Sequence, residues 1–330
     1  MIQIPSQFAI HFALDFYSRT RIFGGRASEV PLFSEMKRSL QYAAAISNGS
    51  SLCIEKYHGN SHQVIFSPAT RGLRPTCRCE LSDLMIIIFS PTLKQARLTF
   101  LQAKYEKQIR PFPCLNSYEA NIEQWDLLSN RPSIKGALSS FCPPRDLLSA
   151  AILPSIGTFA FFIELPNNNF QIFYVIASEL SLARFPGNSK YCRLKPKAYP
   201  ICGTHNYCAY FSGGHYSSNS TTPGSHNECL VACGNVAFAD QLYRMKIGSP
   251  IGQHNSSTAG TREWLGRTLS HLIERNVAPN FDATLIREFM RTMEIPASDG
   301  GRINDEQQGA RSSGFGARSL LILKSNLGEG

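Results

Sequence analysis

The sequence predicts an α/β protein in which amphipathic helices accompany strands that are buried on both faces. Three observations support this class: a helical repeat of apolar residues over 28–47, an apolar run rich in β-branched residues over 81–91, and two amphipathic stretches over 261–276 and 281–294. The chain has 330 residues, of which 43% are hydrophobic and 17% are charged. It is therefore long and apolar enough to form two globular domains.

The first half of the chain is expected to combine two helices with several strands. Phe33, Met36 and Leu40 recur at helical spacing in the first helix, and the polar residues 48–50 then end the pattern. The run over 81–91 has the composition of a central strand, because it is apolar and ends at Pro91. The other expected elements are strands at 51–57, 62–68 and 97–107 and a helix at 119–130.

The second half is expected to be a mixed α/β domain that regulates or assembles the first. The Pro143-Pro144 pair marks the boundary, so the predicted domains are 1–142 and 143–295. Strands are expected within 150–165 and 169–180, followed by the two C-terminal helices. Residues 296–330 read as a flexible tail, in which the apolar end 319–324 adds a strand or binds a partner.

Charge and composition limit the classes of binding partner and the cellular compartment that we expect for the protein. The formal net charge of +9 favours polyanionic partners. The N-terminal residues lack a basic segment followed by a long apolar core, which predicts a cytoplasmic protein whose ten cysteines are reduced. The longest uncharged stretch, 147–163, contains Pro154 and Gly157, so a buried element is expected there instead of a membrane span.

A metal site is predicted from two neighbouring strands. Gln102 and Lys104 lie two residues apart in the strand 97–107 and share a face, and Asp83 of the preceding strand can project toward them. The Asp83 carboxylate and the Gln102 carbonyl oxygen are the hard ligands that Mg²⁺ or Mn²⁺ prefers. Lys104 would position or help deprotonate the attacking water and offset charge on a scissile phosphate. Gln102 and Lys104 in an otherwise apolar strand are costly to bury without partners, which indicates a site.

The motif resembles the PD-(D/E)xK, or restriction-endonuclease-like, nuclease superfamily in its Q-x-K form. Glu80 and Asp83 match an E-x-x-D pattern, and Gln102 and Lys104 match the Q-x-K that follows it. The likeness covers about residues 28–135 and is strongest to nuclease subunits of bacterial antiphage systems, of the Lamassu or cyclic-nucleotide-signalling type. It implies a restriction-endonuclease-like core, with a mixed sheet flanked by helices, in the first domain.

The predicted site is poor in carboxylates, because Leu84 follows Asp83 and Gln102 is neutral. The resemblance implies a further acid from the first helix, and Glu29 shares the helical face of Met36. Two alternatives stay open. Asp83 and Lys104 could form a structural ion pair, with Gln102 bonded to a loop, or the fold could bind DNA without cutting it.

Two further patterns lie beyond residue 180. A Cys/His-rich segment has the ligand types of a structural zinc site but not a repeated C-x₂-C spacing, so ordinary core cysteines are favoured over zinc. The candidate zinc ligands are Cys202, Cys208, Cys229 and Cys233. The segment between Leu180 and Asn227 has no acidic residue and interleaves cations with aromatics. This suits either a track for a nucleic-acid backbone or a solvated basic loop.

Together these patterns and the resemblance predict a cytoplasmic, Mg²⁺-dependent DNA endonuclease that serves as the effector of an antiphage defence system. Its expected partners are DNA and either further copies of itself or other defence subunits. The alternative is a non-catalytic DNA-binding or scaffold subunit that retains the nuclease fold.

Overall fold

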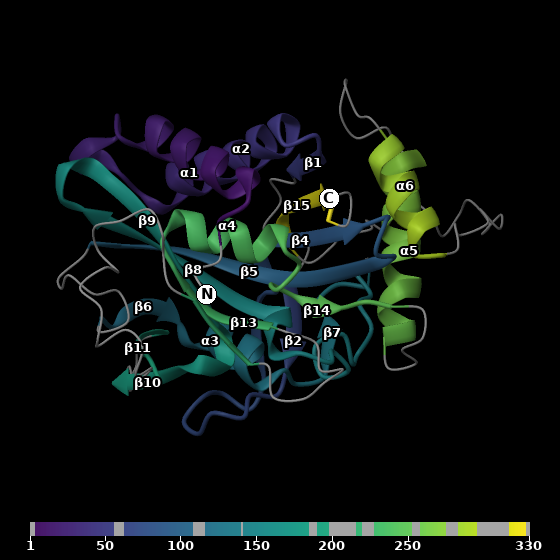
Figure 1. The fold of residues 1–330 in the computed structure, drawn as a ribbon. Helices are drawn as coiled ribbons and strands as arrows, with labels where there is room; N and C mark the ends of the chain where they lie inside the picture. The colour runs from purple at the N-terminus through teal and green to yellow at the C-terminus, as the bar shows by residue number, and fades with distance from the viewer. Residues whose placement is uncertain are drawn as a thin grey trace.

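The computed structural model describes residues 4–55, 63–107, 116–139, 141–184, 190–197, 216–219, 228–252, 258–274, 283–295 and 317–327. They form a mixed α/β fold around one large mixed sheet, with helices on one face and a helix and two small sheets on the other (Figure 1). The predicted α/β class is confirmed.

The large sheet has the strand order β1-β15-β4-β5-β8-β9-β13-β12, with the short β14 beside β5. β15 runs parallel to β4, β4 antiparallel to β5, and β5 parallel to β8. All nine residues of β4 are buried, as expected of a central strand. The strands are β1 (Ser50–Glu55), β4 (Ser82–Ser90), β5 (Gln95–Lys107), β8 (Gly157–Leu165), β9 (Asn169–Ile176), β12 (Tyr216–Asn219), β13 (Glu228–Cys233), β14 (Ser249–Pro250) and β15 (Ala317–Lys324).

Three helices cover one face of this sheet: α1 (Gln7–Thr20), α2 (Glu29–Ile46) and α4 (Asn235–Tyr243) (Figure 1). α2 was predicted, whereas α1 was not. Phe8, Phe12 and Phe16 line the buried side of α1 at a spacing of four residues. The Phe16 ring centroid lies 6.2 Å from that of Phe162 in β8, so α1 packs directly on the central strands.

The opposite face carries the sheet β3-β2-β7, the sheet β10-β11-β6 and the helix α3 (Ile122–Asn130). Tyr118 of β6 stacks on Phe161 of β8, with ring centroids 4.1 Å apart, and so holds the second small sheet against the large one. The strands of these two sheets are β2 (Gln63–Phe66), β3 (Cys77–Glu80), β6 (Tyr118–Asn121), β7 (Ile134–Gly136), β10 (Leu180–Arg184) and β11 (Tyr191–Pro196).

The pairing of β5 with β8 joins residues from both sides of the boundary predicted after residue 142. The sheet therefore does not divide there. The apolar run of β8 is buried at every position but Glu164, and it pairs with β5 over residues 157–164, as expected of a strand inside the sheet. Sequence reasoning separated them because the Pro-Pro pair looked like a linker.

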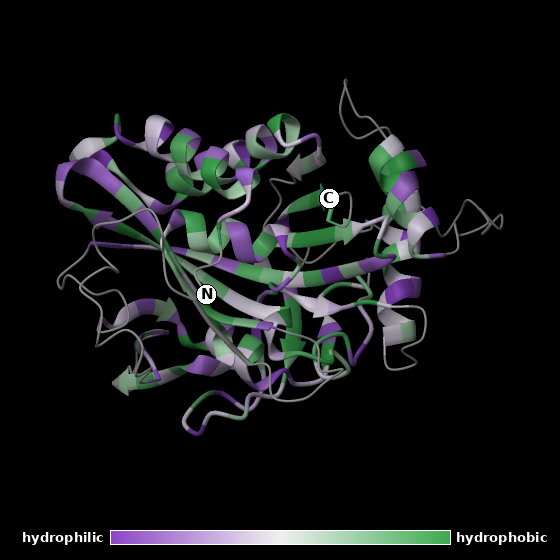
Figure 2. Ribbon diagram, viewed as in Figure 1, coloured by the Kyte–Doolittle hydropathy of each residue, from purple (hydrophilic) through white to green (hydrophobic). Residues whose placement is uncertain are grey.

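The prediction of a flexible tail over 296–330 is wrong for β15. Leu320, Leu321 and Ile322 are fully buried, because this strand lies between β1 and β4 in the large sheet. The predicted alternative, that 319–324 adds a strand, is confirmed. The hydrophobic colouring of β4 and β15 shows the same apolar centre (Figure 2). Residues 296–316 lie outside the described part of the chain.

The two remaining helices, α5 (Ala259–Glu274) and α6 (Thr284–Thr292), agree with the amphipathic stretches predicted near the C-terminus. Phe289 of α6 meets Phe89 of β4 edge to face, with ring centroids 5.4 Å apart. Within the described ranges, no helix is both long enough and apolar enough to span a membrane.

Candidate active site

The candidate site lies where the pairing of β4 with β5 ends. Their ladder ends at the pair Leu84–Leu101, while β5 continues beside β8 as far as Lys107. The backbone N–H of Ala103 therefore faces β4 without a ladder partner, and it donates instead to Oδ2 of Asp83, at 2.9 Å. The split between the strands thus fixes the Asp83 carboxylate, which is 4% exposed, in one orientation.

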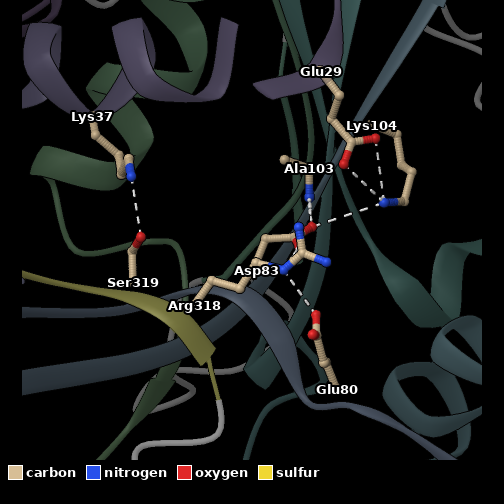
Figure 3. Close-up of polar contacts among 8 residues, drawn as sticks. All are labelled: Glu29, Lys37, Glu80, Asp83, Ala103, Lys104, Arg318 and Ser319. Carbon is tan, nitrogen blue, oxygen red and sulfur yellow. Dashed lines mark hydrogen bonds and ion pairs between the residues drawn. The ribbon is translucent and has the colours of Figure 1, made fainter. Parts of the chain in front are cut away.

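Lys104 bridges two carboxylates at this point (Figure 3). Its Nζ lies 3.3 and 3.4 Å from the two carboxylate oxygens of Glu29, and 3.8 Å from Oδ2 of Asp83. Glu29 comes from the first turn of α2, above the strands. The structure therefore brings together three residues that the sequence singled out from three different elements.

Gln102 is the unusual member of the group. It is fully buried, and neither its amide oxygen nor its amide nitrogen has a hydrogen-bond partner among the described residues. Alternation along β5 puts it on the face of Lys104, and continuing the β4–β5 register by one step places it opposite Asp83. A buried amide without partners costs about 1–3 kcal/mol, so it points to a ligand at this place.

Glu80 completes the group through an arginine that sequence reasoning missed. Nε of Arg318, in β15, lies 2.9 Å from Oε2 of Glu80 and 3.6 Å from Oδ1 of Asp83. Figure 3 shows the Arg318 side chain reaching from β15 to these carboxylates. The parallel register that pairs Ala317 with Ser82 sets Arg318 beside Asp83. No local pattern signals this, because the two strands pair only in the folded sheet.

Burial and neighbouring charges shift the pKa values of Glu29, Glu80 and Arg318. Burial raises the pKa of Glu29, and repulsion by Asp83 adds to this while attraction by Lys104 opposes it. Burial also raises the pKa of Glu80, against the attraction of Arg318. Burial lowers the pKa of Arg318, but the charges of Asp83 and Glu80 outweigh it and raise the value overall. The carboxylates therefore share a partly desolvated environment that favours cations.

The residues present fit a divalent ion held largely by oxygen and water. The Asp83 carboxylate and the partnerless Gln102 carbonyl oxygen are suitable first ligands, with Glu29 and Glu80 nearby. Within the described residues, no three His, Cys, Asp or Glu side chains are placed to hold an ion by themselves. Mg²⁺ usually keeps several waters and takes one or two carboxylates, so a site of this kind suits it better than zinc.

The predicted zinc set does not fit the described part of β13. Cys229 and Cys233 are four residues apart in an extended strand, so their α-carbons are about 13 Å apart. Two thiolates on one zinc ion each lie about 2.3 Å from it, so these two cannot share an ion. Burial raises the pKa of Cys229, which also disfavours the thiolate. Cys202 and Cys208 lie outside the described residues.

The basic segment is described only in part, over 181–184, 190–197 and 216–219. Nη1 of Arg193 lies 3.0 Å from Oε1 of Glu106, and Glu106 follows Lys104 by two residues on the same face of β5. Nζ of Lys190 lies 5.4 Å from the ring centroid of Tyr191. The small sheet β10-β11-β6 is therefore anchored beside the candidate site, and it carries exposed cations.

Comparison of the chain with protein-family models, with curated proteins and with solved structures finds no match in any of the three.

Proposed function

We propose that the protein is a Mg²⁺-dependent DNA endonuclease with a restriction-endonuclease-like core. The observation that supports this most is the buried, partnerless amide of Gln102 beside Asp83 and Lys104, at the split between β4 and β5. A structural ion pair would account for Asp83 and Lys104, but not for an amide left without partners next to them. A metal ion bound to the Gln102 carbonyl oxygen would account for one of its two polar atoms.

In the proposed reaction, a water oxygen bonds to the phosphorus of the DNA backbone, the bond to the leaving sugar oxygen breaks, and that oxygen takes a proton from a solvent water to become a hydroxyl. A bound Mg²⁺ would polarise the phosphate and lower the pKa of the water. Lys104, held by Glu29 and Asp83, donates to a phosphate oxygen where negative charge develops. Glu29, whose pKa is raised by burial, would take the proton of the attacking water.

A second candidate function is a DNA-binding or scaffold subunit without catalysis. It is favoured by one observation: Lys104 and Arg318 already neutralise much of the carboxylate charge. Both functions use the net charge of +9 to attract a polyanion. They differ in whether a divalent ion binds and whether the phosphate backbone is cut.

The biological setting follows from the motif resemblance. We place the enzyme in the cytoplasm as the effector of a bacterial antiphage system, with activity restrained until the chain oligomerises or meets a partner subunit. A constitutively active DNA nuclease would attack the host genome, so restraint is part of the proposal. A shift of a few kcal/mol between inactive and active assemblies would be enough to switch such an enzyme.

Incubation of the purified protein with supercoiled plasmid tests the proposal. Wild-type protein at high concentration should nick or linearise the plasmid with Mg²⁺ and not with a chelator. Lys104→Ala should lower the rate about a hundredfold or more, because it removes a donor to the transition state. Lys107→Ala is the matched control, since Lys107 is an exposed lysine at the end of the same strand. Equal cleavage by wild type and Lys104→Ala would refute the assignment.

A further inference from the structure

Arg318 holds the place of a cation between two carboxylates. Its Nε lies 2.9 Å from Glu80 and 3.6 Å from Asp83, whose Oδ1 is the oxygen not engaged by the Ala103 N–H. We expect a divalent ion to bind Asp83 at the same oxygen, because Oδ2 already accepts the Ala103 N–H and lies 3.8 Å from Nζ of Lys104. The Arg318 guanidinium and a divalent ion would therefore compete for Oδ1 of Asp83.

The position of Arg318 is fixed by its strand. Ser319 accepts a hydrogen bond from Nζ of Lys37 in α2, at 3.1 Å, and Leu320 and Leu321 are fully buried. The backbone of β15 thus cannot withdraw from β4 without breaking the core. The Arg318 side chain itself is 52% exposed, so it can turn toward solvent while its strand stays in place.

The charges of the site make this competition strong. Glu29, Glu80 and Asp83 contribute −3, and Lys104 and Arg318 contribute +2, which leaves −1 for an entering ion of charge +2. Turning Arg318 away changes that balance to −2. Even at the dielectric constant of water, a divalent ion and a unit positive charge about 5 Å apart repel enough to weaken binding roughly tenfold.

We propose that Arg318 is a positioning residue that stands in for the metal ion, keeping Asp83 and Glu80 in place and raising the Mg²⁺ concentration at which the site fills. This rests on the proposed function, because it takes Asp83 as a metal ligand. The displaced guanidinium would stay within a side-chain length of the site, and a guanidinium is well suited to bind a phosphate group.

The test is a metal-binding measurement without DNA. Mn²⁺ binding to the full chain is followed by electron paramagnetic resonance, and Mg²⁺ binding by calorimetry. Arg318→Gln should bind either ion about tenfold more tightly than wild type. Arg318→Lys retains the charge and should bind like wild type. Arg267→Gln is the matched control, since it removes one positive charge from an exposed ion pair on α5.

The outcomes separate the two proposals. Tighter binding by Arg318→Gln alone supports the competition. Equal or weaker binding by a folded Arg318→Gln, with a unique thermal transition near that of wild type, overturns it and leaves the metal site standing. Absence of binding by wild type and all three variants overturns the metal site, and with it the proposed nuclease and the role of Arg318.

Discussion

Replacing Gln102 by methionine should stabilise the protein and abolish the stabilisation by Mg²⁺. Both polar atoms of the Gln102 side chain are fully buried and lack hydrogen-bond partners among the described residues. Each unsatisfied buried group costs about 1–3 kcal/mol, while methionine has a similar length and shape and no hydrogen-bonding demand. We expect Gln102→Met to raise the free energy of unfolding by about 1–3 kcal/mol.

The assay is chemical denaturation in the presence of a chelator, so that no ion binds Gln102. The matched control is Gln171→Met in β9. Gln171 accepts from the Asn235 N–H at 3.1 Å and donates to Asn169 at 2.9 Å, so its loss should destabilise by about 1–2 kcal/mol. With Mg²⁺ added, wild type should gain stability and Gln102→Met should not. A loss of stability in Gln102→Met without metal would refute the reasoning, since it would mean that the amide has partners.

Three other predictions follow from the same side chains. Burial raises the pKa of Glu29 in the folded state, so its carboxylate opposes folding increasingly as pH rises above the ordinary value of 4.5. Glu29→Gln should therefore gain stability relative to wild type as pH rises from about 4 to about 7 in denaturation curves, and a constant difference would contradict this. Asp126 is fully buried and accepts hydrogen bonds from the backbone N–H groups of residues 69 and 70. Asp126→Ala should therefore lower the free energy of unfolding by about 2–4 kcal/mol and leave the Mg²⁺ affinity unchanged. A changed Mg²⁺ affinity would mean that Asp126 belongs to the candidate site. Cys142 is exposed, whereas Cys229 is buried and burial raises its pKa, so an alkylating reagent should modify Cys142 before Cys229 in the folded protein. Mass spectrometry of timed samples measures the order, and modification of Cys229 before Cys142 would contradict the burial of β13.

The sequence predicts the placement of those site residues whose directions follow from the periodicity of a single strand or helix. Alternation along β5 placed Gln102 and Lys104 on one face, and helical spacing in α2 placed Glu29 on the face of Met36. Both inferences needed only neighbours in sequence. The side chains of one strand or one helix turn keep fixed directions whatever the rest of the chain does.

The features that sequence reasoning missed depend on distant pairing. Arg318 reaches Glu80 because β15 inserts between β1 and β4, and nothing in residues 317–324 specifies those neighbours. The same insertion made the end of the chain look like a tail. α1 was missed although its phenylalanines repeat every four residues, because the N-terminal segment was read only for targeting signals.

Because β15 comes from the end of the chain, the large sheet can be completed only after the other strands have been synthesised. Glu80 and Arg318 are 238 residues apart in the sequence, so a ribosome adding about 5–20 residues per second makes the arginine roughly 10–50 s after the glutamate. Throughout that interval β4 lacks its β15 neighbour and Glu80 lacks its arginine partner. A chain halted before residue 317 would keep β4 without that neighbour, and an unpaired strand edge is the kind of surface that other strands and chaperones bind.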